Sequence, residues 1–205
     1  MFHYSTVEAE TYEILKKIFS IDAIKKRFAL AGGTSLSLQL GHRHSIDLDI
    51  FSPDVFDTRD LELILSSTPG LKFQLINRTE RMLFSYINNV KCDFVNEPSA
   101  LIHPFLVEDG VNYFHVEDIA AMKMHTVCGR GKKKDFFDIY VLIENFGWQN
   151  MLKWFASKYG DSQYYFLWRS IAYFEDAEDD VDIIGFKPYT KSWEEIKSFI
   201  KEKCV

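Results

Sequence analysis

Two aspartates one residue apart have the side chains and the spacing best suited to chemistry in this chain. Asp47 and Asp49 lie in the apolar segment 45–51, and alternate residues of a β-strand point to the same face. The two carboxylates could then share one or two Mg²⁺ ions, as phosphoryl-transfer reactions require. The apolar residues around them would anchor the strand in a core, namely Ile46, Leu48 and Ile50. The alternative is a surface strand that carries two solvated acids.

A glycine pair precedes these aspartates by a short stretch of chain. Gly32 and Gly33 stand between a short apolar strand segment and a short apolar helical segment. Glycines at this point let backbone N–H groups approach a phosphate closely, and the N-terminus of the following helix adds partial positive charge. Thr34 and Ser35 add hydroxyl donors. A tight turn is the alternative, but the short separation from Asp47 favours a phosphate-binding loop.

A third carboxylate, Asp93, interrupts the apolar strand segment 90–95, where aspartate is normally depleted. If this strand pairs beside segment 45–51, Asp93 joins Asp47 and Asp49 in one cluster. Three neighbouring carboxylates repel one another unless divalent cations neutralise them. The pattern therefore predicts a cation site, with an exposed acid on an edge strand as the alternative.

Cationic residues follow in the second half of the chain. Lys123 has small neighbours in a predicted helix over 116–128, which makes it a candidate for contact with nucleotide phosphates; a surface lysine is the alternative. The run 129–134 holds four cations in what we expect to be a flexible loop suited to phosphate contact, with plain solvation as the alternative. Asp135 and Asp138 open the next helix, where they could cap it, hold a lysine in place or orient a substrate.

The histidines and cysteines give weaker signals. His42 and His44 flank Arg43, and we expect an exposed turn there rather than the mouth of an active site. We interpret His115 and His125 as surface or packing residues. The three cysteines show no paired spacing and no zinc signature, which fits a reducing cytoplasm.

Composition limits the class of protein. The chain has 205 residues, of which 47% are apolar and 16% aromatic, and its net charge is −6. This is enough apolar material for one domain, or for a catalytic core with a helical extension, and the acidic total argues against a general DNA-coating protein. No apolar stretch is long enough to cross a membrane, so we expect a soluble, cytoplasmic protein. The acidic run 175–182 is expected to be solvated, with a docking patch for a basic partner as the alternative.

Hydrophobic periodicity divides the chain into an α/β part, 1–114, and a helical part, 115–205. The first part has predicted strands over 28–31, 45–51, 71–78, 81–87 and 90–95, and predicted helices over 6–19, 36–40 and 59–66. Its last two strands form a predicted hairpin with a turn at Asn88-Asn89, and segment 98–114 has no clear pattern. The second part has predicted helices over 116–128, 135–146, 148–159, 162–174 and 192–203.

Two stretches of the chain resemble one known family. Residues 31–51, which contain the glycine pair and the first two aspartates, look like the first motif of the AbiEii-type nucleotidyltransferases. Residues 117–138, which run from Glu117-Asp118 through Lys123 to Asp138, resemble the second conserved region of that family. The likeness covers residues 25–145. The family belongs to the polymerase-β-like nucleotidyltransferase superfamily.

The resemblance implies an α+β fold, in which a polymerase-β-like core with a small mixed sheet precedes a C-terminal helical bundle. The implied activity is Mg²⁺-dependent transfer of a nucleoside monophosphate from an NTP to an acceptor hydroxyl, with release of pyrophosphate. The residues implied to hold the nucleotide are Gly32, Gly33, Thr34, Ser35, Lys123 and Arg130. The residues implied to be catalytic are Asp47, Asp49, Asp93, Lys123 and Asp135, with Asp138 as a further candidate. Two Mg²⁺ ions would be bound by Asp47, Asp49 and Asp93.

The resemblance also implies a biological setting. Family members are commonly toxins of bacterial toxin–antitoxin or phage-defence pairs with a separately encoded antitoxin, and some are similar to enzymes that nucleotidylate tRNA 3′ ends. The chain is shorter than many relatives. This difference affects the prediction of the acceptor more than the prediction of the reaction. Two alternatives stay open: nucleotidylation of a small molecule such as an aminoglycoside, and a non-catalytic regulator that binds a nucleotide or a partner.

Overall fold

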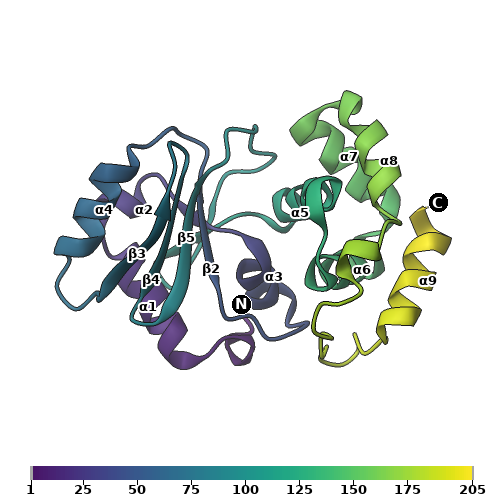
Figure 1. Cartoon of the computed structure of the whole chain (residues 1–205), viewed down its shortest axis with the longest axis horizontal. Coiled ribbons are helices and arrows are strands. Elements are labelled where there is room, and N and C mark those ends of the chain that lie inside the picture. The colour runs from purple at the N-terminus through teal and green to yellow at the C-terminus, as the bar shows by residue number, and fades with distance from the viewer. Residues whose placement is uncertain (1, 205) are drawn as a thin grey trace. The chain divides into compact units, whose positions relative to one another are not determined.

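The computed structural model describes residues 2–204, which divide into two units (Figure 1). The first unit extends to Leu40 and includes His44–Ala100 and Pro104–Phe114. The second unit contains Gly41–Arg43, Leu101–His103 and the chain from His115 onward. The second unit therefore includes two three-residue segments that precede His115 in the chain.

A mixed seven-stranded sheet forms the centre of the first unit, in the order β3-β4-β5-β2-β1-β7-β6. Its strands are β1 (Ala29–Leu30), β2 (Leu48–Ser52), β3 (Phe73–Arg78), β4 (Met82–Ile87), β5 (Val90–Asn96), β6 (Leu106–Glu108) and β7 (Val111–Tyr113). The pairs β2–β5 and β1–β7 are parallel, and the others are antiparallel. The predicted α/β architecture with a mixed sheet is confirmed.

Helices cover both faces of this sheet. They are α1 (Ala9–Phe19), α2 (Asp22–Lys25), α3 (Gly32–Leu40) and α4 (Thr58–Ser67), after a short 3₁₀ turn at Tyr4–Thr6. In Figure 1, α1, α2 and α4 lie on one side of the sheet and α3 lies on the other. Leu15 and Ile18 of α1 are fully buried, because apolar residues at helical spacing form one face that packs on the sheet. On strand β2, Leu48, Ile50 and Ser52 are fully buried, whereas Asp49 and Phe51 on the other face are half-buried.

The predicted hairpin is confirmed as β4 and β5. Asn88 and Asn89 adopt φ of 50° and 68°, the left-handed conformation that a two-residue hairpin turn requires and that asparagine tolerates. Segment 98–114, which has no clear pattern in the sequence, contains the three-residue strands β6 and β7. Strands this short leave too little sequence for a period to show.

The second unit is helical. It contains α5 (Val116–Arg130), α6 (Lys133–Phe146), α7 (Trp148–Tyr159), α8 (Tyr164–Ser170) and α9 (Trp193–Cys204), with 3₁₀ turns at Asp161–Gln163 and Glu175–Ala177. The predicted helix 162–174 is wrong at its C-terminal end, because α8 ends at Ser170. Within residues 2–204, no helix combines the length and the apolar character needed to cross a membrane.

The predicted flexible loop 129–134 is also wrong. Helix α5 continues through Arg130, and only Gly131 and Lys132 separate it from α6. The Lys132 N–H donates to Asp135 Oδ2 at 3.1 Å, so an acid in the first turn of α6 satisfies a backbone donor that would otherwise have no partner in the helix.

Candidate active site

Two carboxylates face one another across the parallel pair β2–β5. Asp49 lies directly opposite Asp93 in this register. Their neighbours on both strands are fully buried and point to the other face, namely Leu48, Ile50, Cys92 and Phe94. Because side chains alternate along a strand, both aspartates project from the same face of the sheet. The condition stated for Asp93, that strand 90–95 pairs beside the first aspartate strand, is therefore met.

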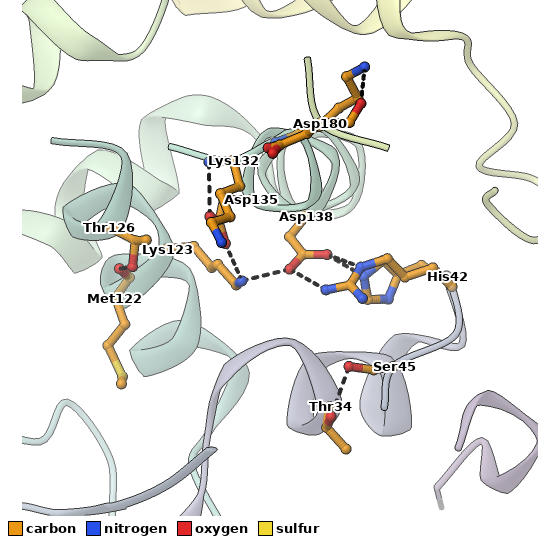
Figure 2. Close-up of polar contacts among 12 residues, drawn as sticks. Thr34, His42, Ser45, Met122, Lys123, Thr126, Lys132, Asp135, Asp138 and Asp180 are labelled. Carbon is orange, nitrogen blue, oxygen red and sulfur yellow. Dashed lines mark hydrogen bonds and ion pairs between the residues drawn. The ribbon is translucent and has the colours of Figure 1, made fainter. Parts of the chain in front are cut away.

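Asp47 lies one residue before β2 and is positioned by Thr34. The Thr34 hydroxyl donates to the Asp47 carbonyl oxygen, and it lies 2.8 Å from Ser45 Oγ (Figure 2). Thr34 is fully buried, as is Ser35, whose Oγ accepts from Gln39 Nε2 at 3.1 Å. These two hydroxyls hold the scaffold together, and the phosphate contact implied for them stays a prediction.

Ile46 does not anchor the strand as predicted. Its side chain is 66% exposed, because the strand begins only at Leu48 and, within residues 2–204, Ile46 pairs with no strand. Leu48 and Ile50 are fully buried, as expected.

Gly32 brings the start of α3 against the Asp49 side chain. Its φ is +63°, and a Cβ atom added there would lie 2.1 Å from Asp49 Oδ2. The Ala31 N–H donates to the Asp49 carbonyl oxygen at 2.8 Å. A side chain at position 32 would therefore be strained by the backbone and would overlap the carboxylate. Gly32 and Asp49 form one cradle, in which a helix N-terminus lies beside an acid.

Lys91 is a site residue that the sequence analysis missed. Its Nζ lies 2.7 Å from Asp93 Oδ2. Burial would lower the pKa of Lys91, but the Asp93 carboxylate outweighs this effect and the pKa is raised. The signal was present in the sequence, because Lys91 precedes Asp93 by two residues and so shares its face of the strand.

Asp93 offers an oxygen to a divalent cation. Asp93 Oδ1 is buried and has no hydrogen-bond partner among residues 2–204, and an unsatisfied buried oxygen is costly. Its other oxygen already contacts the Lys91 ammonium. Carboxylate oxygens are the ligands that Mg²⁺ prefers, so Asp47, Asp49 and Asp93 are the residues that could hold such an ion.

A second set of charges, within the second unit, is centred on Asp138 of α6. This carboxylate is fully buried. Arg43 donates to it from Nε at 2.7 Å and from Nη2 at 2.8 Å, and Lys123 Nζ lies 2.8 Å from Oδ2 (Figure 2). Burial would raise the pKa of Asp138, but Arg43 and Lys123 hold it well below its usual value. Asp138 is thus a permanent anion that orders two cations.

Lys123 lies between Asp138 and Asp135. Its Nζ is 2.8 Å from Asp135 Oδ1, and the residue is 7% exposed. Burial would lower the pKa of Lys123, but Asp138 and Asp135 outweigh this and raise it. The interpretation as a surface lysine is wrong, and Asp135 both caps α6 and holds the lysine. Lys123 is consequently a fixed, charged ammonium.

His42 and Arg43 do not form the exposed turn that we expected. His42 is fully buried and Arg43 is 4% exposed, since both side chains bind Asp138; His42 Nε2 lies 2.8 Å from Oδ1. Burial lowers the pKa of His42, and its Nδ1 has no hydrogen-bond partner in the described part of the chain. A neutral ring that donates from Nε2 accounts for both facts. His42 and Asp138 lie far apart along the chain, so no local sequence pattern could predict this pairing.

The basic run and the acidic run meet in the second unit. Lys133 is buried, and its Nζ donates to the carbonyl oxygens of Glu178 and Asp180 and lies 2.9 Å from Asp182 Oδ1. Part of the acidic run therefore binds a lysine of the same chain. Arg130, by contrast, is exposed in the last turn of α5.

The structure brings Gly32, Asp49 and Asp93 together in the first unit, and Lys123, Asp135 and Asp138 together in the second. The first group could bind a cation beside a phosphate cradle. The second group offers a positive charge whose position is fixed by two carboxylates.

Comparison with known proteins gives consistent findings. The profile of the family described as "Nucleotidyl transferase AbiEii toxin, Type IV TA system" matches residues 13–201. An uncharacterized protein from Aquifex aeolicus (strain VF5), aq_aa25, is 32% identical over 203 residues, which are 96% of this chain and 95% of that protein.

Two solved structures share the fold at low sequence identity. The nucleotidyltransferase toxin MenT4 from Mycobacterium tuberculosis H37Rv has a TM-score of 0.51 at 12% identity, over 96% of this chain and 84% of that one. ANT(2″)-Ia in complex with adenylyl-2″-tobramycin has a TM-score of 0.57 at 14% identity, over 77% of this chain and 99% of that one.

Proposed function

We propose a nucleotidyl-transfer reaction at the Asp47, Asp49 and Asp93 carboxylates of this chain, which belongs to the AbiEii nucleotidyltransferase toxin family. The chain is a nucleotidyltransferase. The proposal adds that it moves a nucleoside monophosphate from an NTP to an acceptor hydroxyl, with a divalent ion such as Mg²⁺. The observation that supports it most is the register of Asp49 opposite Asp93, with Gly32 packed on Asp49.

The carboxylates would each have a separate role. Asp47 and Asp49 would hold the cation, which would neutralise charge on the carboxylates and on the triphosphate. Asp93 would take the proton of the acceptor hydroxyl as its oxygen attacks the α-phosphorus in line. A new O–P bond then forms, the bond to the bridging oxygen breaks, and pyrophosphate leaves. Backbone N–H groups at Gly32 and Gly33 would orient the phosphates.

Two cations of the second unit are proposed to contact nucleotide phosphates. We assign this role to Lys123, whose raised pKa keeps it protonated. Asp135 would position Lys123 through their 2.8 Å ion pair. The exposed Arg130 would add a further phosphate contact.

Transfer to RNA is the direct test. The pure protein is incubated with a divalent ion, each labelled NTP in turn, and total tRNA. We expect label on the RNA from one NTP, and we expect Asp49→Asn to abolish it without changing the melting temperature. Asp60→Asn, an exposed acid on α4, is the matched control. Full activity in Asp49→Asn would overturn the site assignment.

We further propose that the chain is the cytoplasmic toxin of a toxin–antitoxin or phage-defence pair, as its family suggests. Co-expression with the neighbouring gene product should relieve any growth arrest caused by the wild type. A small-molecule acceptor is the second candidate, since the fold is shared with ANT(2″)-Ia, whose structure contains adenylyl-2″-tobramycin. The same assay with an aminoglycoside in place of tRNA separates the two.

A further inference from the structure

We infer that His103, His115 and Glu117 form a binding site for a divalent transition-metal ion of the Zn²⁺ class. All three belong to the second unit. Their ligating atoms, one from each side chain, lie within 4.8 Å of one another. None of these residues has a role in the proposed nucleotidyl transfer, so the inference stands apart from that function.

The geometry suits coordination. His103 Nε2 lies 2.6 Å from Glu117 Oε2, and the centroids of the His103 and His115 rings are 4.3 Å apart. Around a tetrahedral Zn²⁺ with bonds of about 2.0–2.2 Å, ligand atoms are roughly 3.4 Å apart. Small side-chain rotations therefore convert the present spacing into a three-ligand site.

The backbone that carries these ligands is already fixed. Asp118 is fully buried and accepts hydrogen bonds from the Ile102 N–H at 3.0 Å and the His103 N–H at 3.1 Å. Lys158 Nζ balances its charge at 2.9 Å. This buried pair attaches the segment that carries His103 to the first turn of α5, where Glu117 lies and which His115 caps. Ligands held on fixed backbone bind a metal with little loss of conformational entropy.

The ligand chemistry selects the ion. Two imidazoles and one carboxylate suit Zn²⁺, Co²⁺, Ni²⁺ or Cu²⁺, whereas Mg²⁺ prefers oxygen ligands. The site would thus take a different ion from the aspartates of the first unit. Partial positive charge at the N-terminus of α5 opposes a cation, but the Glu117 carboxylate offsets it and the dipole effect is small beside direct coordination.

One coordination position would remain open. The side chains of His103 and Glu117 are 41% and 26% exposed, so solvent reaches the ion. Three protein ligands with an open fourth position for water distinguish this arrangement from closed structural zinc sites.

Spectroscopic titration with Co²⁺ tests the site directly. The full-length protein is stripped with EDTA, dialysed and titrated with Co²⁺, and visible absorption bands of nitrogen-ligated Co²⁺ are recorded. We expect saturation at one equivalent in the wild type. We expect loss of the bands in His103→Gln and in His115→Ser, which keeps a side chain able to cap α5. His125→Gln is the matched control, because His125 is exposed on the same helix and stacks on Tyr159.

Two further variants make the result decisive. Asp93→Asn should retain the bands, which excludes binding at the first-unit carboxylates. His103→Gln alters an exposed side chain, and its fold is checked by circular dichroism, so it tests the site even if His115→Ser is unstable. An ion pair between His103 and Glu117 without a metal predicts no bands in the wild type, and bands that persist in His103→Gln place the ion elsewhere. Either result overturns the inference.

Discussion

Gly32 is a residue of the candidate site whose replacement the structure tolerates poorly. Both its φ of +63° and the 2.1 Å between an added Cβ and Asp49 Oδ2 oppose any side chain. Gly110 has a φ of +80° and open space around its Cβ position, so it isolates the backbone effect. We expect Gly110→Ala to cost about 1 kcal/mol of unfolding free energy. Gly32→Ala should cost more and should also reduce transfer.

Urea unfolding and the nucleotidyl-transfer assay measure these two quantities. Equal loss of stability in both variants, with activity intact in Gly32→Ala, would show that Asp49 moves away without consequence and that the cradle has no catalytic use.

Lys91 bears on how the carboxylates bind a cation. Its ammonium contacts Asp93 Oδ2 at 2.7 Å, in competition with any metal ion for that oxygen. We expect Lys91→Met, which keeps the apolar stem, to bind Mn²⁺ several-fold more tightly and to gain more thermal stability from it. Calorimetry and thermal melts check this. Lys72→Met, at an exposed lysine before β3, is the control; weaker Mn²⁺ binding in Lys91→Met would instead make the lysine a partner of the metal-bound state.

For single residues, the sequence predicts contacts with residues that lie close along the chain. Strand alternation places Asp49 and Asp93 on one face once their strands pair, but the pairing itself was a condition that only the structure could supply. His42 and Asp138 are 96 residues apart, and no local pattern reports such a contact. The prediction that Ile46 anchors the strand was wrong for a different reason, because apolarity alone does not mark the residue at which a strand begins.

Among the elements, α5 and α6 are joined by the buried charges around Asp138, and this junction should respond to acid. Burial lowers the pKa of His42 below the 6.5 of an unfolded histidine. Between these two pKa values the unfolded chain binds more protons than the folded chain, so stability rises with pH and is lost as pH falls below 6.5. Because the folded structure lowers the pKa of Asp138, this carboxylate reduces stability further only when the pH falls below its usual pKa of 3.8.

We therefore expect His42→Gln to make the free energy of unfolding less dependent on pH below 6.5. Its amide N–H₂ can still donate to Asp138 but does not titrate. One histidine contributes at most about 1.4 kcal/mol per pH unit in this window. Urea unfolding at a series of pH values measures the slope, with His44→Gln on the same segment as the control. Parallel profiles for His42→Gln and the wild type would mean that another group controls the acid response.

The elements were predicted best where they are long and periodic. Helices α1, α6 and α7 and the hairpin β4–β5 follow from apolar spacing. The short strands β6 and β7 depend on pairing with distant segments. The run 129–134 was interpreted from its charge, although Lys133 lies buried with carbonyl oxygens as its partners. Composition alone did not reveal that Lys133 contacts the acidic run 175–182.

At the scale of the whole molecule, the main finding is where the chain divides into its two units. The sequence suggests a boundary between 114 and 115, whereas the second unit also includes Gly41–Arg43. Arg43 donates two hydrogen bonds to the buried Asp138 carboxylate, so a fragment that begins at 115 lacks these donors. Removing one partner of a buried ion pair costs about 3–5 kcal/mol, a large part of the roughly 5–15 kcal/mol by which domains are stable.

We expect fragment 115–205 to unfold without a cooperative transition, or well below the melting temperature of the intact chain. Thermal circular dichroism measures this, and Arg43→Met in the intact chain is the control, because it removes the same donors without cutting the backbone. A large loss in both proteins assigns the effect to Arg43. If Arg43→Met melts like the wild type, other parts of the segment 41–43 stabilise the helices, such as the Phe186 N–H bond to the His42 carbonyl oxygen. Cooperative unfolding of the fragment at the melting temperature of the intact chain would show that the helical unit needs no part of the segment 41–43.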